Sequence, residues 1–188
     1  MASPNHLKVK RLVTASALAA FSAVVQLIHI GYQSPQFGMW IDIVAVTWVA
    51  AYFLFDLKTS FIVSFLGAII ITLFAPDTWL GAAMKLLGSV PMFLFPAIMA
   101  ISLKKTSDYF KKPLNLLAPT AVALFVRCLL VIPVNYFFAI PIWTGMSPQK
   151  AMSAIPWFVI AAFNVVQGLV DVTFSWILVY KFKLKRFS

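Results

Sequence analysis

The sequence predicts an all-α integral membrane protein, a bundle of six transmembrane helices with both termini in the cytoplasm. Three observations lead to this fold class. Hydrophobic residues make up 62% of the 188 residues and charged residues 11%, with a mean hydropathy of +0.95. A soluble domain has about 45–50% apolar residues and about 25% charged residues. The apolar residues form six runs, and a membrane helix needs about 20 of them. Lys and Arg lie almost entirely on one side of these runs.

The six expected spans are apolar runs separated by polar, proline or glycine residues. They cover residues 12–30, 40–56, 59–75, 82–103, 116–142 and 154–180 of a single domain, 1–188. Because five runs follow the first, we expect it to be a retained helix and not a signal peptide. The short segment 56–59 predicts a tight hairpin of the second and third helices. We expect Pro133 and Pro141 to kink or end the long fifth helix near one surface.

The orientation follows from the positive charges. With six spans, twelve of the fifteen Lys and Arg residues fall on one side, which membrane proteins place in the cytoplasm. These are Lys8, Lys10, Arg11, Lys58, Lys104, Lys105, Lys111, Lys112, Lys181, Lys183, Lys185 and Arg186. We therefore expect a multi-pass protein of the cell (plasma) membrane with segments 31–39, 76–81 and 143–153 outside. The net charge of +10 then reports membrane topology, and nucleic acid is not an expected partner.

Polar side chains inside the spans predict a cavity. A charge at the centre of a span costs about 2.5–3.5 kcal/mol, so each such residue needs a reason. At 1.5 Å per residue, five of them from four helices fall in the outer half, and Trp40 stands next to the first. The candidate substrate-binding residues are Trp40, Asp42, Lys85, Asn135, Asn164 and Gln167. The alternative is that these groups only join helices through hydrogen bonds worth about 0.6–2 kcal/mol each.

Two further patterns concern helix packing. Arg127 and Asp171 lie at matching depths in the fifth and sixth spans, which predicts a structural ion pair; a proton or ion relay is the alternative. Ala15, Ala19 and Ala23 repeat every four residues, and such a stripe lets another helix approach closely. The stripe is expected either to dock a partner protein or to pack inside the bundle.

The motifs of enzymes and of ATP-driven pumps do not occur in the sequence. It contains no HExxH, no GxSxG, no phosphate-binding loop and no paired carboxylates within one span. We therefore expect no enzymatic activity, no metal and no cofactor, and any uphill transport must draw its energy from partners. A stand-alone facilitator, a membrane enzyme and an assembly scaffold stay open as alternatives. A repeated polar stripe along a whole span, as a pore needs, is not seen.

Three short segments carry a resemblance to a known family. They are 40–43, 135–143 and 163–168, which read WIDI, NYFFAIPIW and FNVVQG. With the six-span topology and the alanine stripe, they resemble the S components, the substrate-binding membrane subunits of energy-coupling-factor (ECF) vitamin transporters, and most of all the riboflavin-specific type. This chain departs from that type at two positions, since Gln167 stands where lysine is expected and Ala45 where a second acid is expected.

The resemblance implies a function. The chain would bind riboflavin from outside with high affinity and deliver it inward together with a transmembrane coupling subunit and two cytoplasmic ATPase subunits. Asn135 and Asn164 would hydrogen-bond the ligand, and Ala15, Ala19 and Ala23 would dock on the coupling subunit. Another vitamin or flat heterocycle is the alternative ligand.

Overall fold

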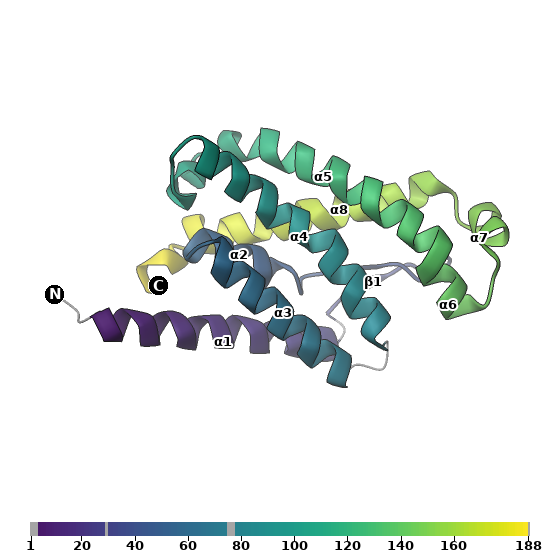
Figure 1. Ribbon diagram of the computed structural model, residues 1–188, viewed down its shortest axis with the longest axis horizontal. Helices are drawn as coiled ribbons and strands as arrows, with labels where there is room; N and C mark the ends of the chain where they lie inside the picture. The colour runs from purple at the N-terminus through teal and green to yellow at the C-terminus, as the bar shows by residue number, and fades with distance from the viewer. Residues whose placement is uncertain (1–3, 29, 75–77, 188) are drawn as a thin grey trace.

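The computed structural model describes residues 4–28, 30–74 and 78–187 as a helical bundle with one small β-hairpin. Its elements are α1 (Pro4–Ile28), β1 (Gly31–Gln33), β2 (Trp40–Asp42), α2 (Val46–Leu54), α3 (Leu57–Phe74), α4 (Thr78–Ser102), η1 (Ser107–Lys111), α5 (Leu114–Val134), η2 (Asn135–Ala139), α6 (Ile140–Thr144), α7 (Pro148–Ala154), α8 (Trp157–Trp176), η3 (Ile177–Lys181) and η4 (Leu184–Phe187). The start of α1 and the end of the chain lie at one end of the bundle, and α6 and α7 lie at the other (Figure 1). We call these the terminal end and the hairpin end.

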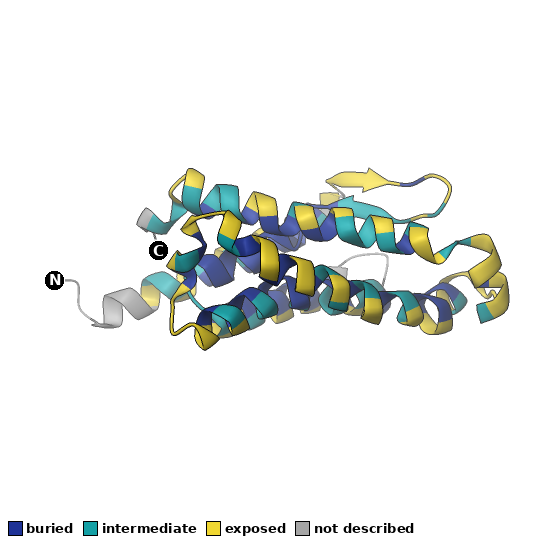
Figure 2. Ribbon diagram, turned by 90° about the horizontal axis from the view of Figure 1, so that it is seen from above, coloured by how far each residue is buried: buried dark blue, intermediate teal, exposed yellow. Residues whose placement is uncertain are grey.

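Long apolar helices dominate, as expected for a membrane protein. Within the described residues, four stretches are long and apolar enough to cross a bilayer: Val9–Gln26, Trp79–Ser102, Leu114–Thr144 and Trp157–Lys181. The apolar stretch Leu57–Leu73 in α3 is somewhat shorter. Many side chains on the outer faces of these helices are exposed and apolar, as lipid contact requires (Figure 2). The number of membrane crossings and their direction stay predictions.

The expected second helix over 40–56 is wrong. Residues 40–42 form β2, paired antiparallel with β1, and only Val46–Leu54 is helical. Nine residues span about 14 Å, half of a hydrocarbon core of about 30 Å. All nine are buried, and α2 contacts α1, α3, α4 and α8. Irregular backbone is tolerated at membrane depth only where protein or a cavity surrounds it, and here both do.

The β-hairpin depends on one glycine. Gly31 faces Asp42 in the β1–β2 register. A Cβ atom at position 31 would lie 2.3 Å from the carbonyl oxygen of Ile41, so no other residue fits this close backbone approach. Sequence periodicity does not reveal a two-stranded element of three residues per strand, because such strands are too short to show an alternating pattern.

The fifth helix continues past both prolines. Pro133 lies within α5 and Pro141 in the first turn of α6, and the helical backbone runs on to Thr144. The change after Pro133 is a π-helical segment, η2, that begins at Asn135. Proline removes one helical hydrogen bond, and a π-bulge is one way to absorb the change, often at a functional site. The predicted kink is therefore a local widening of the helix beside Asn135.

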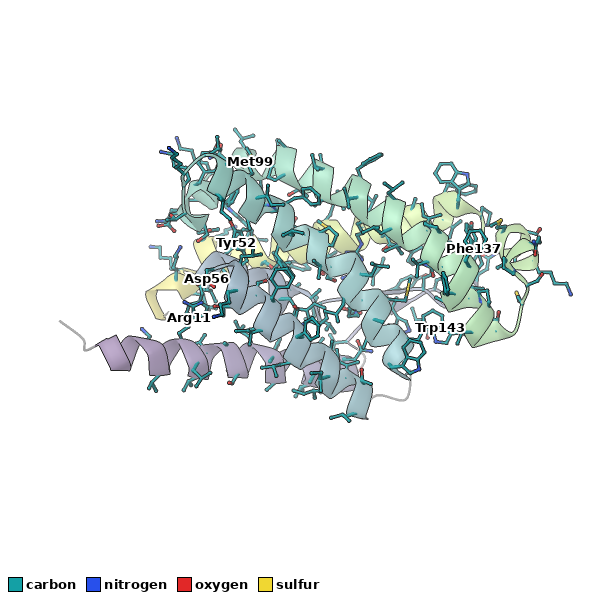
Figure 3. All side chains as sticks on the ribbon, viewed as in Figure 1. Arg11, Tyr52, Asp56, Met99, Phe137 and Trp143 are labelled. Carbon is teal, nitrogen blue, oxygen red and sulfur yellow. The ribbon has the colours of Figure 1, made fainter. Side chains whose placement is uncertain are left out.

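The apolar core lies mainly toward the terminal end. Its largest fully buried side chains are Trp48, Phe53, Phe93 and Phe110, and the rings of Phe53 and Phe110 are 6.2 Å apart. At the same end, Arg11 of α1 hydrogen-bonds to Asp56 in the α2–α3 turn (Figure 3). Burial raises the pKa of Asp56, but hydrogen bonds from Thr59 and Arg11 outweigh it, so the net shift is downward.

Candidate functional site

A cavity of about 440 Å³ lies in the half of the bundle that carries the hairpin. This volume falls within the range of about 300–1,000 Å³ seen for small-molecule sites. The hairpin, α4, α5, η2, α6 and α8 all contribute to its wall. The structure brings every predicted substrate-binding residue to this one wall: Trp40, Asp42, Lys85, Asn135, Asn164 and Gln167.

Sequence reasoning missed several polar groups of the same wall. Gln26 comes from the end of α1, Gln33 from β1 and Ser89 from α4. Gln26 interrupts an apolar run near its outer end, so the criterion that selected Asn164 would also have selected it. Ser89 left no comparable signal, because a lone serine in a membrane helix is common and costs little. Aromatic walls come from Trp40, Trp143 and Phe163 among others.

Gln167 holds the hairpin in place. Its side-chain oxygen accepts a hydrogen bond from the Asp42 backbone N–H (2.8 Å), and its Nε2 donates to the Asp42 carbonyl oxygen (2.8 Å). Nε2 also donates to Asp171 Oδ1 (2.7 Å). Both amide hydrogens are therefore used within the protein. Gln167 lines the cavity, but its hydrogen bonds are made within the protein and connect α8 to β2.

Lys85 and Asp42 form an ion pair at the cavity wall. The second carboxylate oxygen of Asp42 accepts from the backbone N–H of Val44 (2.9 Å), which fixes the bend between β2 and α2. The side chains of Lys85 and Asp42 are 19% and 9% exposed, so water screens the pair only weakly. Lys85 of α4 thus holds the same strand that Gln167 holds from α8.

Arg127 joins the second charge pair to the cavity. Its Nη1 lies 3.3 Å from Asp171 Oδ2, and its Nε donates to Asn164 Oδ1 (3.0 Å). The predicted ion pair of Arg127 and Asp171 is therefore present, and Arg127 also lines the cavity. The guanidinium packs against Gly88, where a Cβ atom would lie 3.1 Å from Nη2. A neutral glycine on α4 thus leaves room for the charge on α5.

The two asparagines present different groups to the cavity. Asn164 donates one amide hydrogen to the carbonyl oxygen of Ile160 (2.9 Å) and accepts from Arg127, which leaves one N–H donor. Asn135 donates one hydrogen to the carbonyl oxygen of Val131 (2.9 Å), which leaves one donor and its acceptor oxygen. The charged groups form two pairs of opposite sign, so the cavity has no net charge.

The alanine stripe packs inside the bundle. Ala15, Ala19 and Ala23 are 6%, 2% and 4% exposed, and α1 contacts α3 and α2. The stripe was expected either to dock a partner protein or to pack inside the bundle, and the structure shows internal packing. These three side chains are not accessible to a docking partner. Small residues do occur on the outer face of α1, where Ser16 and Ala20 are exposed.

Comparison with known proteins identifies a similar fold among solved structures. No family model matches the chain, and no curated protein matches it. Among solved structures, the chain is similar to the S component of a bacterial ECF transporter, with 23% sequence identity and a TM-score of 0.71. The match covers 96% of this chain and 98% of that one. At this identity the likeness shows the fold, and it extends over the whole length of both chains.

Proposed function

We propose that the chain is the substrate-binding subunit of an ECF vitamin importer and that its ligand is riboflavin. The observation that carries the proposal is the single cavity wall to which six separately selected residues contribute. An assembly scaffold has no need of such a cavity. The similarity in fold to an S component supports the same function.

The chemistry of the cavity favours a neutral, flat ligand. The ion pairs Lys85–Asp42 and Arg127–Asp171 cancel their charges, so an anionic or cationic vitamin would find no countercharge. Asn164 offers a donor, and Asn135 a donor and an acceptor. An imide-like ring edge, with two carbonyl oxygens flanking an N–H group, satisfies this set, and the isoalloxazine ring of riboflavin has such an edge. Aromatic walls suit the ring faces.

The direction of transport follows from the charges. The terminal end carries the lysines of η1, η3 and the α4–α5 connection, and cytoplasmic ends are positive. The cavity in the hairpin half then takes its ligand from outside. The proposed importer also contains a coupling subunit and two ATPase subunits, because the sequence has no phosphate-binding loop of its own.

Purification tests the proposal directly. The protein should bind riboflavin in detergent, with quenching of flavin fluorescence at one ligand per chain. In liposomes it should show no flux until the coupling and ATPase subunits are added. Flux without partners would favour the facilitator, and binding of a different neutral heterocycle would change the ligand but not the class.

A further inference from the structure

A second cavity lies at the terminal end, away from the proposed substrate site. Its volume is about 510 Å³. Four lysines and two large aromatic side chains contribute to its wall: Lys111, Lys181, Lys183, Lys185, Trp176 and Tyr180. Side-chain nitrogens, blue in Figure 3, gather at this end of the bundle. The substrate-binding proposal makes no use of this cavity.

The helical path of the chain is interrupted where three of these lysines follow one another. Lys181, Lys183 and Lys185 are two residues apart, and residues at this spacing do not share a face of a regular helix. The helix ends after η3, and Lys183 has a positive φ of 57°, which is uncommon for a residue with a side chain. This break between η3 and η4 lets alternate lysines line one cavity.

The positive charge of the cavity is only partly neutralised. Asp108 of η1 pairs with both Lys111 (3.2 Å) and Lys185. The hydrogen bond from Lys185 lowers the pKa of the Asp108 carboxyl, so this group stays ionised. Among the described residues, Lys181 and Lys183 have no acidic partner, and both are exposed. Over the described part of the chain, one carboxylate pairs with two of the four cavity lysines, which favours the binding of an anion.

Two aromatic residues of the cavity wall are of the types common at the membrane surface. Trp176 Nε1 donates to the carbonyl oxygen of Phe110 (2.8 Å), and the Tyr180 hydroxyl donates to that of Ser107 (2.6 Å). Their polar atoms thus bind η1 while the rings form the wall. Tryptophan and tyrosine are enriched at the level of lipid headgroups. Phe182, between the two unneutralised lysines, is 66% exposed and offers apolar surface beside them.

From this arrangement we infer that the cavity formed by η1, η3 and η4 binds the phosphate headgroup of an anionic phospholipid, with Lys181 and Lys183 as the principal contacts. Basic pockets at the cytoplasmic ends of membrane helices bind such headgroups. The exposed apolar side chain of Phe182 favours an amphiphile over free phosphate, because it contacts an acyl chain at no desolvation cost. Bound lipid would hold η1 and the end of α8 at a fixed height in the inner leaflet.

The test compares two double variants of the full chain in nanodiscs. Lys181→Gln with Lys183→Gln removes two cavity lysines. Lys104→Gln with Lys105→Gln removes the same charge from the same end but outside the cavity, and each pair includes one residue with positive φ, 52° at Lys104. Phosphatidylglycerol in a phosphatidylcholine bilayer is the probe, and native mass spectrometry together with the unfolding temperature measures its binding.

We expect the cavity variant to bind phosphatidylglycerol about 30-fold more weakly, while the control binds it like the wild type. All three proteins should unfold at the same temperature in pure phosphatidylcholine. Equal losses in both variants would reduce the site to general surface charge and overturn the inference. Competition by millimolar inorganic phosphate would assign the cavity to a soluble anion. Unchanged lipid binding with loss of assembly would assign it to a protein partner.

Discussion

Gln167 binds β2 as a neighbouring strand would, since its side-chain amide exchanges two 2.8 Å hydrogen bonds with the backbone N–H and C=O of Asp42. A free strand edge inside a membrane bundle would leave these two groups without water or protein partners. Gln167 of α8 therefore satisfies the outer edge of the strand, while Lys85 of α4 holds the side chain of the same residue.

The first prediction concerns the hydrogen bonds that Gln167 makes to β2. Gln167→Leu should destabilise the protein by about 2–5 kcal/mol, because it leaves three buried partners unpaired at about 1–3 kcal/mol each, with partial relaxation. Ligand affinity should fall as well, since β2 carries Trp40 and Asp42. Gln149→Leu, on the exposed face of α7, is the control. Thermal unfolding and ligand titration that leave the Gln167 variant unchanged would show that the hairpin is held by other contacts.

The second prediction concerns the amides. Asn164→Ala and Asn135→Ala should each weaken riboflavin binding by about 1–3 kcal/mol, or about 5- to 150-fold, because a desolvated ligand group loses its partner. Asn164→Asp is a sharper variant, since it keeps the acceptor for Arg127 but lacks both amide hydrogens, the one donated to the Ile160 carbonyl oxygen and the one left for the ligand. It should still fold, because the Ile160 carbonyl lies within the regular helix α8, and it should bind ligand weakly. Wild-type affinity in the Asp variant would mean that the donor does not contact the ligand.

The third prediction separates stability from binding at Arg127. Arg127→Met should lower stability by about 3–5 kcal/mol, because it leaves Asp171 buried without a countercharge. Adding Asp171→Leu should restore most of this stability, as replacement of a buried ion pair by apolar residues often does. The double variant should nevertheless bind ligand weakly, because Asn164 loses the bond that orients its amide. Recovery of full affinity in the double variant would confine Arg127 to a structural role.

The fourth prediction concerns α1. Ala19→Trp should prevent folding or lower the unfolding temperature strongly, because position 19 is buried against the bundle and overpacking is destabilising. Ala20→Trp, one residue away on the exposed face, should leave folding and ligand binding intact. Loss of assembly with the coupling subunit in the Ala20 variant alone would place the docking face on the outside of α1. A stable Ala19 variant that only fails to assemble would restore the alanine stripe as the interface.

The fifth prediction concerns topology. In a background with Cys128→Ala, a cysteine at Gln149 should react with a membrane-impermeant reagent in intact cells. A cysteine at Lys105 should react only after the cells are opened. Both positions are exposed, so burial does not explain a difference. The reverse pattern would place the cavity on the cytoplasmic side and would contradict import by this route.

The sequence predicts some features because membranes restrict them strongly. Long apolar runs and costly polar groups mark helices and a cavity without any tertiary information. Asn135, Asn164 and Lys85 were selected on this basis and line one cavity, and their contact with a substrate stays a prediction. The β-hairpin was not predicted, because strands of three residues show no alternating pattern and the side chain that bonds the backbone of β2, Gln167, is more than 100 residues away. The burial of Ala19 likewise depends on which neighbour covers α1. The role of Arg127 in the wall depends on side-chain direction, which depth along a helix does not determine.

The central claim is that the cavity lined by Asn135, Asn164 and Arg127 binds riboflavin, and titration of the purified wild-type protein and Asn164→Asp with riboflavin tests it most directly. The wild type should quench flavin fluorescence stoichiometrically, with one site per chain. The variant should need at least about fivefold higher ligand concentration for half-maximal binding. No quenching by a folded wild-type protein, or equal affinity of the two proteins, would contradict the account.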